Sequence, residues 1–282
     1  MESIAIVIPV YNRSQLIQRT FNSILCQTYR PIELILVDNG STDDSLALCT
    51  EFKEKYQSDQ LIVKVLQEKK RGANVARNRG LEAVESEYVT FFDSDDELFP
   101  EMINAIRQAI TKQQADIIAY TYTFYENEQK EYVRIRCFSN QPRMQIIRGM
   151  LATQNFTVKR EVIRAIGGWD ESLQRWQDWE VGVRLLFHTD NIYWIKYPPL
   201  CRAHIHEDTI SGRNFSDAHI SLYKAVERVY ETIQATERPD AKKLLNAAYF
   251  RFLLLAGNYS HEGRKDLGRL YYTKLMQLMG KE

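Results

Sequence analysis

Three acidic residues fall within the four positions Asp93–Asp96, which read Asp-Ser-Asp-Asp and follow the apolar pair Phe91-Phe92. Carboxylates this close repel one another unless a cation or protons offset their charge. Oxygen ligands at the end of a strand suit Mg²⁺ or Mn²⁺, and either ion keeps positions open for the oxygens of a diphosphate. A helix-capping turn before Pro100 is the alternative, because Asp and Ser favour such turns. The stretch therefore predicts a divalent-metal site or a simple turn.

Two other turns carry polar residues where predicted strands end. Pro9 and Tyr11 lie at the end of one apolar run, and Asp38 follows another at 32–37. An aspartate can accept a hydrogen bond from the imide N–H of uracil or from a guanine edge, and a tyrosine ring can pack against a base. A capping or Asx-turn role for Asp38 and a packed surface ring for Tyr11 are the alternatives. These residues are candidates for binding a nucleotide base.

Arg77 lies in the stretch 71–78, which enters a predicted helix. Its planar guanidinium could bind a diphosphate as a fork of donors. Arginine on a helix is also commonly solvated or ion-paired, so the sequence leaves both roles open.

Asp178 stands near the start of a helix predicted over 177–188. An ionised aspartate placed over a cleft can remove the proton from an incoming hydroxyl group. An acidic residue at this place would also complement the helix N-terminus. The neighbouring Trp176 and Trp179 would either face a sugar or fill the core. Asp178 is therefore a candidate general base.

His204 and His206 lie on a short extended segment predicted over 200–206. An imidazole there could contact a metal or a phosphate. A histidine that stands alone is more often structural, so both interpretations stay open.

These residues are positioned by alternating strand-like and helix-like periods over the first 125 residues, a pattern typical of βαβ units on a largely parallel sheet. In such a sheet, ligands collect beyond the carboxyl ends of the strands, so the polar turns should form one rim. Asn12 is expected to cap the first helix. The expected strands are 3–10, 32–37, 61–66 and 88–92. The expected helices are 14–27, one that follows Ser41 and Asp44 and runs to about 56, and 73–84.

Beyond residue 98 the periods are less regular. A helix to about residue 112 and one strand near 116–124 are expected, whereas 126–160 mixes charged and aromatic residues without a clean period. A strand at 191–197 follows the helix at 177–188, and the pattern is helical from about residue 216 onward.

Composition excludes several classes of protein. The 282 residues carry 37 Lys+Arg and 37 Asp+Glu, so no basic field favours binding to a nucleic acid. The four cysteines lack metal-site or disulfide spacing, which suits a reducing compartment. Neither a signal peptide nor an apolar run long enough to span a bilayer is found, so we expect a cytoplasmic protein.

The sequence also lacks the signatures G-x-G-x-x-G, G-x-x-x-x-G-K-[ST], H-E-x-x-H and G-x-S-x-G. Their absence argues against an NAD-type Rossmann enzyme, a P-loop NTPase, a zincin and an α/β-hydrolase.

Taken in order, five segments make residues 3–210 similar to family 2 glycosyltransferases of the GT-A fold. They are Ile8–Asn12, Val37–Asp43, Ala76–Asn78, Phe92–Asp96 and the stretch from Gly167 to Asp178. The resemblance implies an α/β fold with a mostly parallel central sheet. It also implies transfer of a sugar from a nucleotide-sugar donor, with inversion at the anomeric carbon.

The resemblance assigns the donor to residues of the first half. Pro9, Tyr11 and Asp38 would hold the base. Arg77 would lie near the nucleotide or diphosphate, and Asp93 would meet the ribose or the metal.

The metal and the acceptor are assigned in the same way. Asp95 would bind the divalent metal, Mn²⁺ or Mg²⁺, and Asp178 would be the general base that deprotonates the acceptor hydroxyl. His204 or His206 would match a distal position that helps to hold the diphosphate or the metal.

Two positions depart from the family pattern. Gln177 stands where Glu often precedes the catalytic aspartate, and Trp169 stands where Phe is usual. Because Gln177 removes a negative charge beside Asp178, Glu180 remains an alternative general base.

We expect a GT-A domain at 1–210, with a nucleotide-binding half at 1–98 and an acceptor-binding half at 99–210, and a helical C-terminal extension at 211–282.

The expected reaction moves a sugar from a UDP-linked donor to a saccharide or lipid-linked acceptor in cell-surface polysaccharide or glycoconjugate synthesis. A non-catalytic nucleotide- or saccharide-binding subunit is the alternative. A sugar-phosphate nucleotidyltransferase is disfavoured, because Tyr11–Arg13 is not a Gly- and Arg-rich phosphate loop.

Basic residues outnumber acidic ones in the predicted C-terminal helices. From residue 251 onward they are Arg251, Arg264, Lys265, Arg269, Lys274 and Lys281, against Glu262, Asp266 and Glu282. Such a face could rest on the anionic inner surface of a membrane, where a lipid-linked acceptor lies. A solvated helical pair or a homodimer contact is the alternative.

Overall fold

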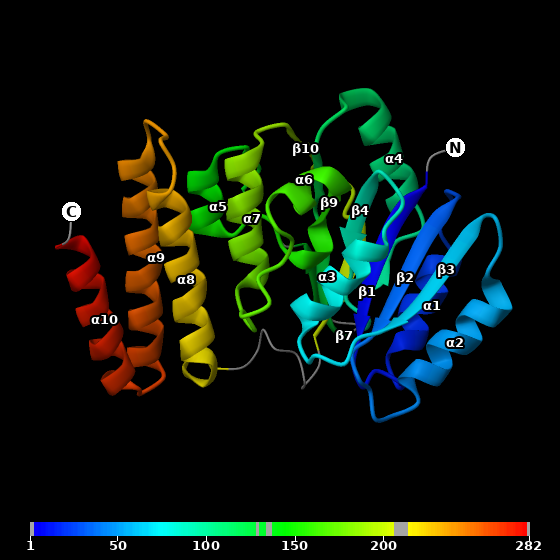
Figure 1. Ribbon diagram of the computed structural model, residues 1–282, viewed down its shortest axis with the longest axis horizontal. Coiled ribbons are helices and arrows are strands. Elements are labelled where there is room, and N and C mark those ends of the chain that lie inside the picture. Colours follow the sequence, from blue (N-terminus) through cyan, green and yellow to red (C-terminus); the bar gives the residue numbers. More distant parts are fainter. Residues whose placement is uncertain (1–2, 128–129, 134–136, 206–213, 281–282) are drawn as a thin grey trace.

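The computed structural model describes residues 3–127, 130–133, 137–205 and 214–280 (Figure 1). The helices are α1 (Ile17–Leu25), α2 (Ser45–Tyr56), α3 (Ala73–Ala83), α4 (Met102–Gln113), α5 (Pro142–Arg148), α6 (Arg160–Ala165), α7 (Gln177–His188), α8 (His219–Gln234), α9 (Ala241–His261) and α10 (Lys265–Met279). The strands are β1 (Ile4–Val10), β2 (Ile32–Asp38), β3 (Leu61–Gln67), β4 (Tyr88–Phe91), β5 (Glu97–Leu98), β6 (Ile117–Tyr120), β7 (Thr123–Asn127), β8 (Lys130–Val133), β9 (Phe156–Lys159), β10 (Ile192–Ile195) and β11 (Cys201–His204). The expected α/β class is confirmed.

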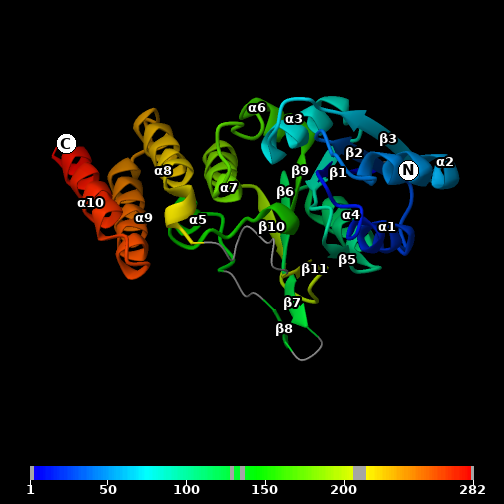
Figure 2. The same ribbon diagram turned by 90° about the horizontal axis from the view of Figure 1, so that it is seen from below.

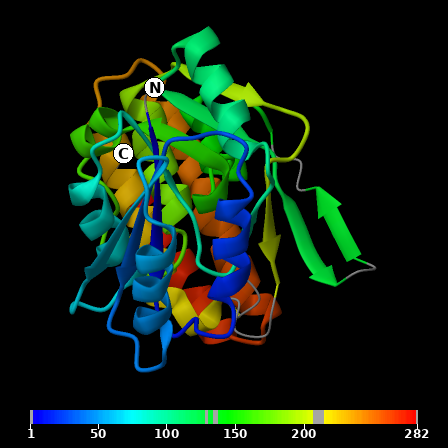
Figure 3. The same ribbon diagram turned by 90° about the vertical axis from the view of Figure 1, so that its right-hand side faces the viewer.

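A seven-stranded sheet forms the centre of the molecule, in the order β10-β6-β9-β4-β1-β2-β3. Strands β1, β2, β3 and β4 are parallel where they pair, and β10 is parallel to β6. Only β9 runs antiparallel to its neighbours β4 and β6 within this sheet. The sheet is therefore mostly parallel, as predicted. Its helices lie on both faces (Figure 3).

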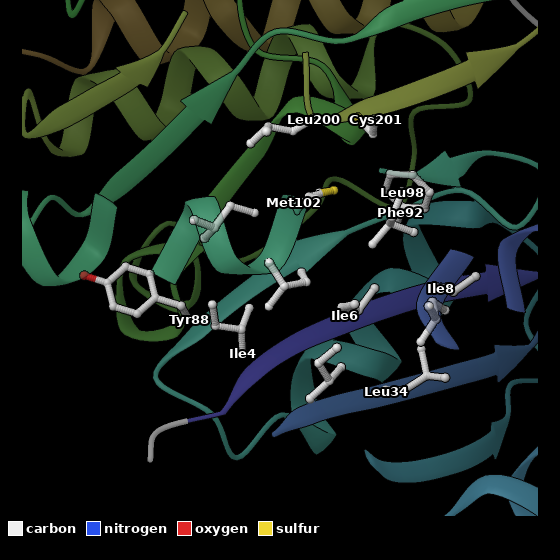
Figure 4. Close-up of a cluster of buried hydrophobic side chains, with 14 of the residues drawn as sticks. Ile4, Ile6, Ile8, Leu34, Tyr88, Phe92, Leu98, Met102, Leu200 and Cys201 are labelled. Atoms are coloured by element: carbon white, nitrogen blue, oxygen red, sulfur yellow. The ribbon is translucent and has the colours of Figure 1, made fainter. Parts of the chain in front are cut away.

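β1 is buried on both faces because its alternate residues enter different cores. Ile4, Ile6 and Ile8 join one cluster, which also holds Met102 of α4 (Figure 4). Val7 points to the opposite face and joins a second cluster beneath α3. Period-two alternation puts neighbouring side chains on opposite sides of a strand, so an unbroken apolar run fits a central parallel strand.

Residues 116–124 form two strands, so the expectation of one strand is wrong. β6 belongs to the seven-stranded sheet, whereas β7 belongs to a second sheet of order β5-β11-β7-β8. Thr121 lies between them, where its hydroxyl donates to the Lys196 carbonyl and its own carbonyl accepts from the Leu200 N–H. No turn-forming Gly or Pro marks the crossing, because Thr121 stands between two tyrosines in a run of strand-forming residues.

The segment 126–160, which shows no clean period in the sequence, supplies β9 to the middle of the large sheet. β9 has only four residues, Phe156–Lys159, and three of them are buried. A strand this short carries too few alternations to stand out from the surrounding charged and aromatic residues.

Helices α8, α9 and α10 form a layered group at one end of the molecule (Figure 2). They share a hydrophobic core with α5 and α7, which contribute Ile146 and Val183. The expected boundary at 210/211 lies outside the described residues. No helix of the described part is long and apolar enough to cross a membrane.

Candidate active site

The loops after β1 and β2 are tied together by Asn12 and Ser41. We expected Asn12 to cap α1, and this prediction is wrong. Its Oδ1 instead accepts the Thr42 N–H at 2.8 Å. Ser41 Oγ accepts the Asn12 N–H at 3.1 Å. These bonds hold the turn that carries Tyr11 beside the turn that follows Asp38.

Asp38 ends β2 with a carboxylate that is 3% exposed. Its Oδ2 accepts the N–H groups of Gly40 and Ser41 at 3.2 and 3.3 Å. Its Oδ1 is buried and has no hydrogen-bond partner among the described residues. Pro9, opposite Val37 in the sheet register, lies at the same edge. A buried acceptor without a partner costs free energy, which a donor on a ligand would relieve.

Tyr11 stands at the rim with 41% of its surface exposed, and Arg71 lies over its ring. The Arg71 guanidinium carbon is 3.4 Å from the ring centroid. Arg71 Nη1 also donates to the carbonyls of Asn39 and Gly40 at 2.8 and 2.9 Å. The sequence does not single out Arg71, because no local spacing links it to Tyr11. A ligand on this face of the ring would also meet the guanidinium.

The acidic loop after β4 is held by hydrogen bonds from three other segments of the chain. Asp93 Oδ1 accepts from Arg77 Nη2 at 2.8 Å, and Asp93 Oδ2 accepts from Gln154 Nε2 at 2.7 Å. The same Gln154 nitrogen donates to Asp96 Oδ2 at 2.9 Å. Asp96 Oδ1 accepts the backbone N–H of His204 at 2.9 Å. One amide therefore fixes the separation of two carboxylates.

These carboxylates retain their protons to higher pH than ordinary aspartates. Burial raises the pKa of Asp96 well above its usual value, and the charges of Asp95 and Asp93 add to the effect. Burial also raises the pKa of Asp93. The charge of Arg77 lowers this pKa, whereas the charges of Asp95 and Asp178 raise it further. Asp178 therefore lies near enough to Asp93 for their charges to interact, and the site accumulates negative charge.

Arg77 is buried on α3, with 3% of its surface exposed, so it is not a solvated helix residue. Its Nη1 donates to Asn74 Oδ1 at 3.0 Å, and its Nη2 binds Asp93. Its guanidinium carbon is 4.8 Å from the Trp169 ring. Trp169 is 2% exposed and packs edge-on against Phe91. Trp169 thus contacts Arg77 from the hydrophobic core.

The loop between α6 and α7 is attached to two helices. Asn74 Nδ2 donates to the Asp170 carbonyl at 2.7 Å. The Asn78 side chain binds both the N–H and the carbonyl of Trp169 at 2.9 Å. Arg228 on α8 donates to Asp170 Oδ2 at 3.1 Å. This loop leads into α7, so these contacts position the residues that open that helix.

Asp178 and Glu180, the two candidate bases, have different surroundings. Glu180 is 2% exposed, and its two oxygens accept from Arg184 Nε and Nη2 at 2.5 and 2.7 Å. Asp178 Oδ1 accepts the Trp179 N–H at 2.8 Å, while no hydrogen bond to its Oδ2 is made by a described residue. Asp178 can therefore offer a carboxylate oxygen to a ligand, whereas Glu180 is engaged by its ion pair.

The tryptophans beside Asp178 are mainly packing residues. Trp179 is 2% exposed and donates its Nε1–H to the Gln145 and Ile146 carbonyls. Trp176 packs partly buried against the same core. Trp179 therefore fills the core and does not face a sugar.

His204 reaches the site through its backbone as well as its ring. Its ring packs 5.1 Å from the Tyr125 ring, and its Nε2 lies 3.4 Å from Glu97 Oε2. Burial lowers the pKa of this imidazole, and the nearby Arg19 lowers it further, against the opposing effect of Glu97. His206, the other predicted histidine, lies outside the described residues.

Asp95 has the ligand chemistry that a divalent metal requires. Its Oδ2 lies 3.4 Å from Arg13 Nε, and its side chain is 15% exposed. No cluster of three or more His, Cys, Asp or Glu ligands occurs in the described ranges. Mg²⁺ commonly binds through one or two carboxylates together with substrate phosphates, and a single aspartate in this loop suits that mode better than a full protein cage. The residues present thus fit a metal that binds together with a diphosphate.

Gln154 is missing from the sequence-based prediction. It lies in a 3-10 turn, Thr153–Asn155, just before β9. A single glutamine in a segment without a period gives no signal of its own. Only the tertiary contact with Asp93 and Asp96 reveals it.

The sequence profile of glycosyl transferase family 2 matches residues 5–167, more than half of the chain. The chain belongs to this family. Glycosyltransferase GlyA of Streptococcus pneumoniae is 38% identical over 135 residues, which cover 48% of this chain and 19% of GlyA. GlyG of the same organism is 36% identical over 131 residues, 46% of this chain and 42% of GlyG. The chain thus spans less than half the length of each of these relatives.

Solved structures share the fold of this family 2 chain. S. aureus TarS 1-349 in complex with UDP aligns with a TM-score of 0.68 at 17% identity, covering 91% of this chain and 70% of that one. Mannosyltransferase PcManGT from Pyrobaculum calidifontis, in complex with GDP-Man and Mn²⁺, aligns with a TM-score of 0.64 at 15% identity. The alignment covers 99% of this chain and 78% of PcManGT. The expected GT-A fold is confirmed.

Proposed function

We propose that the protein is an inverting glycosyltransferase that moves a sugar from a UDP-linked donor to a saccharide or lipid-linked hydroxyl, in the synthesis of a cell-surface polysaccharide or glycoconjugate. The observation that carries this proposal is the convergence of charges. Asp93, which follows β4, is held by Arg77 and Gln154, and its pKa is raised by burial and further by the charge of Asp178 from the start of α7. This supports a base for the acceptor near an acidic loop for the donor, the arrangement that single displacement requires.

The donor base is assigned to the rim formed by β1 and β2. The unpartnered Oδ1 of Asp38 can accept the imide N–H of uracil, and Tyr11 and Pro9 lie at the same edge. Arg77 and Asp93 stand next along the rim, where the ribose and diphosphate would follow. TarS, which shares the fold, has been solved with UDP and with UDP-GlcNAc.

The residues of this chain divide the chemistry of transfer between them. Asp178 takes the proton from the acceptor hydroxyl, and attack from that face inverts the anomeric carbon. A divalent ion bound through Asp95 and the diphosphate would offset the charge that develops on the leaving group. Gln154 holds Asp93 and Asp96 and Arg77 holds Asp93, on either side of the Asp95 that would bind the metal.

The test compares Asp178→Asn with the wild-type chain, using UDP-sugars, Mn²⁺ and a panel of saccharide and lipid-linked acceptors. We expect the rate of transfer to fall by about 10²- to 10⁴-fold, the usual contribution of a general base. Asp190→Asn, at the exposed far end of α7, is the matched control and should keep full activity. Full activity of Asp178→Asn would overturn the assignment.

Donor hydrolysis separates this enzyme from a non-catalytic binding subunit. The wild-type chain with Mn²⁺ should slowly release UDP from a UDP-sugar, whereas a pure binder should release none. A thermal-shift panel of UDP, GDP and CDP would identify the base, because a ligand that binds only the folded state raises the melting temperature. Asp38→Ala should remove the stabilisation by UDP, and selective stabilisation by GDP would instead redirect the donor assignment.

A further inference from the structure

Helix α9 carries an exposed apolar stripe. Phe250, Leu253 and Leu254 are 46%, 48% and 41% exposed. Their spacing of three and four residues puts them on one side of the helix, and Gly257 one turn further on has no atom within 4 Å of where a Cβ would lie. The opposite side of α9 is buried against α5, α8 and α10. This stripe therefore has no covering element among the described residues.

Helix α10 carries a second stripe of the same kind. Tyr272, Met276 and Met279 are 50%, 48% and 45% exposed and follow the same helical spacing. The inward side of α10 packs on its neighbours, and Lys274 lies 3.9 Å from the ring of Tyr223 on α8. The exposed stripe is on the flank of α10 away from that contact with α8.

The two stripes lie side by side. α9 and α10 run antiparallel through a short turn, and Gly268 allows close approach because a Cβ there would overlap Ser260 Oγ. Since α10 meets α8 with one flank and α9 with the other, its exposed stripe adjoins that of α9. We define the α9–α10 face as Phe250, Leu253, Leu254, Tyr272, Met276 and Met279.

Basic residues border this face at both ends. Lys243 lies two turns before Phe250, and Lys265 and Arg269 lie two turns and one turn before Tyr272. All three are exposed, and none makes an ion pair within the described part of the chain. Among the nearby acidic residues, Asp266 pairs with Arg264, and Glu262 accepts the N–H groups of Phe215 and Ser216. Asp240 pairs with Arg238, and its charge also interacts with Lys243. The face therefore combines exposed apolar area with an excess of positive charge.

We infer that the α9–α10 face binds the surface of an anionic lipid bilayer. An amphipathic helical surface with apolar side chains and flanking Lys and Arg gains from apolar burial and from attraction to anionic headgroups. A second copy of the chain fits less well, because two such faces would bring only positive charges together. Charge complementarity thus selects the lipid surface over a homodimer.

The face runs along the flanks of α9 and α10, at the opposite end of the molecule from β1 and β2 (Figure 1). Docking through this face would lay the two helices along the bilayer surface. Binding to vesicles does not depend on the proposed function.

Sedimentation with vesicles tests the inference on the full chain. We expect the wild-type protein to sediment with vesicles of phosphatidylcholine and phosphatidylglycerol, but not with phosphatidylcholine alone. Binding should weaken at high salt, because screening reduces the attraction between exposed charges. The double variant Leu253→Glu/Met276→Glu, and separately Lys265→Glu/Arg269→Glu, should each lower the vesicle partition coefficient by about tenfold or more.

Ile220→Glu is the matched control, since Ile220 is 61% exposed on α8 and lies outside the face. It should bind vesicles like the wild type. Thermal stabilisation by UDP, measured on the same samples, reports folding and the nucleotide site independently of the face. Absence of binding to anionic vesicles, or unchanged binding by both double variants, would overturn the inference. A wild-type dimer in sedimentation equilibrium that Leu253→Glu/Met276→Glu dissociates would assign the face to a second copy instead.

Discussion

Charged side chains at the carboxylate rim and in the C-terminal helices are used in opposite ways. At the rim, Arg77 is 3% exposed and bonds to two different side chains. In the helices, Arg264 is paired only with its close neighbour Asp266, and both side chains are about half exposed or more, at 49% and 64%. Burial strengthens electrostatic interactions, and exposure lets water and salt weaken them.

Residue type alone therefore does not indicate how much an ion pair contributes to stability or activity. An arginine–aspartate pair should contribute little at the start of α10 and much beside β4. Matched substitutions in the two regions test this difference.

The largest effect should come from Arg77→Lys. A lysine ammonium cannot reach Asn74 and Asp93 together, so Asp93 would move within the acidic loop. We expect kcat/KM for transfer to fall by about 100-fold, the usual cost of a small misplacement at a reacting centre. Steady-state kinetics would measure it. Arg79→Lys, two residues along α3 with a side chain 42% exposed, should leave kcat/KM unchanged. Equal losses in both variants would contradict a specific role for Arg77.

The next effect concerns glycines in the two regions. A Cβ on Gly80 of α3 would overlap the Val7 side chain and lie 3.2 Å from that of Val37. Gly80→Ala should therefore lower the free energy of unfolding by about 3 kcal/mol, the upper part of the range for overpacking. Gly257→Ala on α9, with nothing nearby, should raise the free energy of unfolding by about 0.5–1 kcal/mol through helix propensity. Denaturant unfolding would reveal both, and the same sign in both variants would contradict the packing argument.

A buried carboxylate away from the rim gives a pH-dependent contrast. Burial alone would raise the pKa of Glu33, but hydrogen bonds from Lys64, Ser86 and the Glu85 N–H outweigh it, so its pKa lies below the usual value. The ionised form thus stabilises the fold above the ordinary glutamate pKa, and this contribution is lost as the pH falls through the lowered pKa.

Glu33→Gln should accordingly cost about 2 kcal/mol in the free energy of unfolding at pH 7, as expected for hydrogen bonds to a charged group. The difference from wild type should shrink on acidification below about pH 4. Asp266→Asn, at an exposed pair, should show no measurable change in the free energy of unfolding at pH 7. A Glu33→Gln deficit that stays constant from pH 7 to pH 3 would rule out the ionic explanation.

The smallest effect should come from Arg228→Ala, which tests whether the helical end influences the rim. Arg228 is 52% exposed and binds Asp170, whose carbonyl accepts from Asn74 beside Arg77. An exposed ion pair contributes less than about 1 kcal/mol, so kcat/KM should fall by no more than about fivefold. Steady-state kinetics with Glu231→Ala as the control would measure it. A loss as large as that of Arg77→Lys would show that the helices take part in positioning the site.

Several features of the fold follow from local patterns and could be predicted. β1 is apolar throughout and β2 is apolar between Glu33 and Asp38, and Asp38 and Asp93 stand where their strands end, so periodicity located both the strands and the rim. The expectation of one strand over 116–124 is wrong because the chain changes sheets at Thr121 without a turn-forming Gly or Pro. Gln154 was missed because a glutamine without a periodic context carries no local signal.

The sequence by itself determined the α/β order, the ends of the first four strands and the acidic residues at those ends, because these depend on the burial pattern of residues close in the chain. Only the tertiary structure decided that Glu180 is engaged by Arg184 while the Oδ2 of Asp178 receives no hydrogen bond from a described residue. It also placed Arg71 over Tyr11 and Gln154 between two aspartates. Such contacts join residues far apart in the chain, and their burial and pairing exist only once the elements have packed.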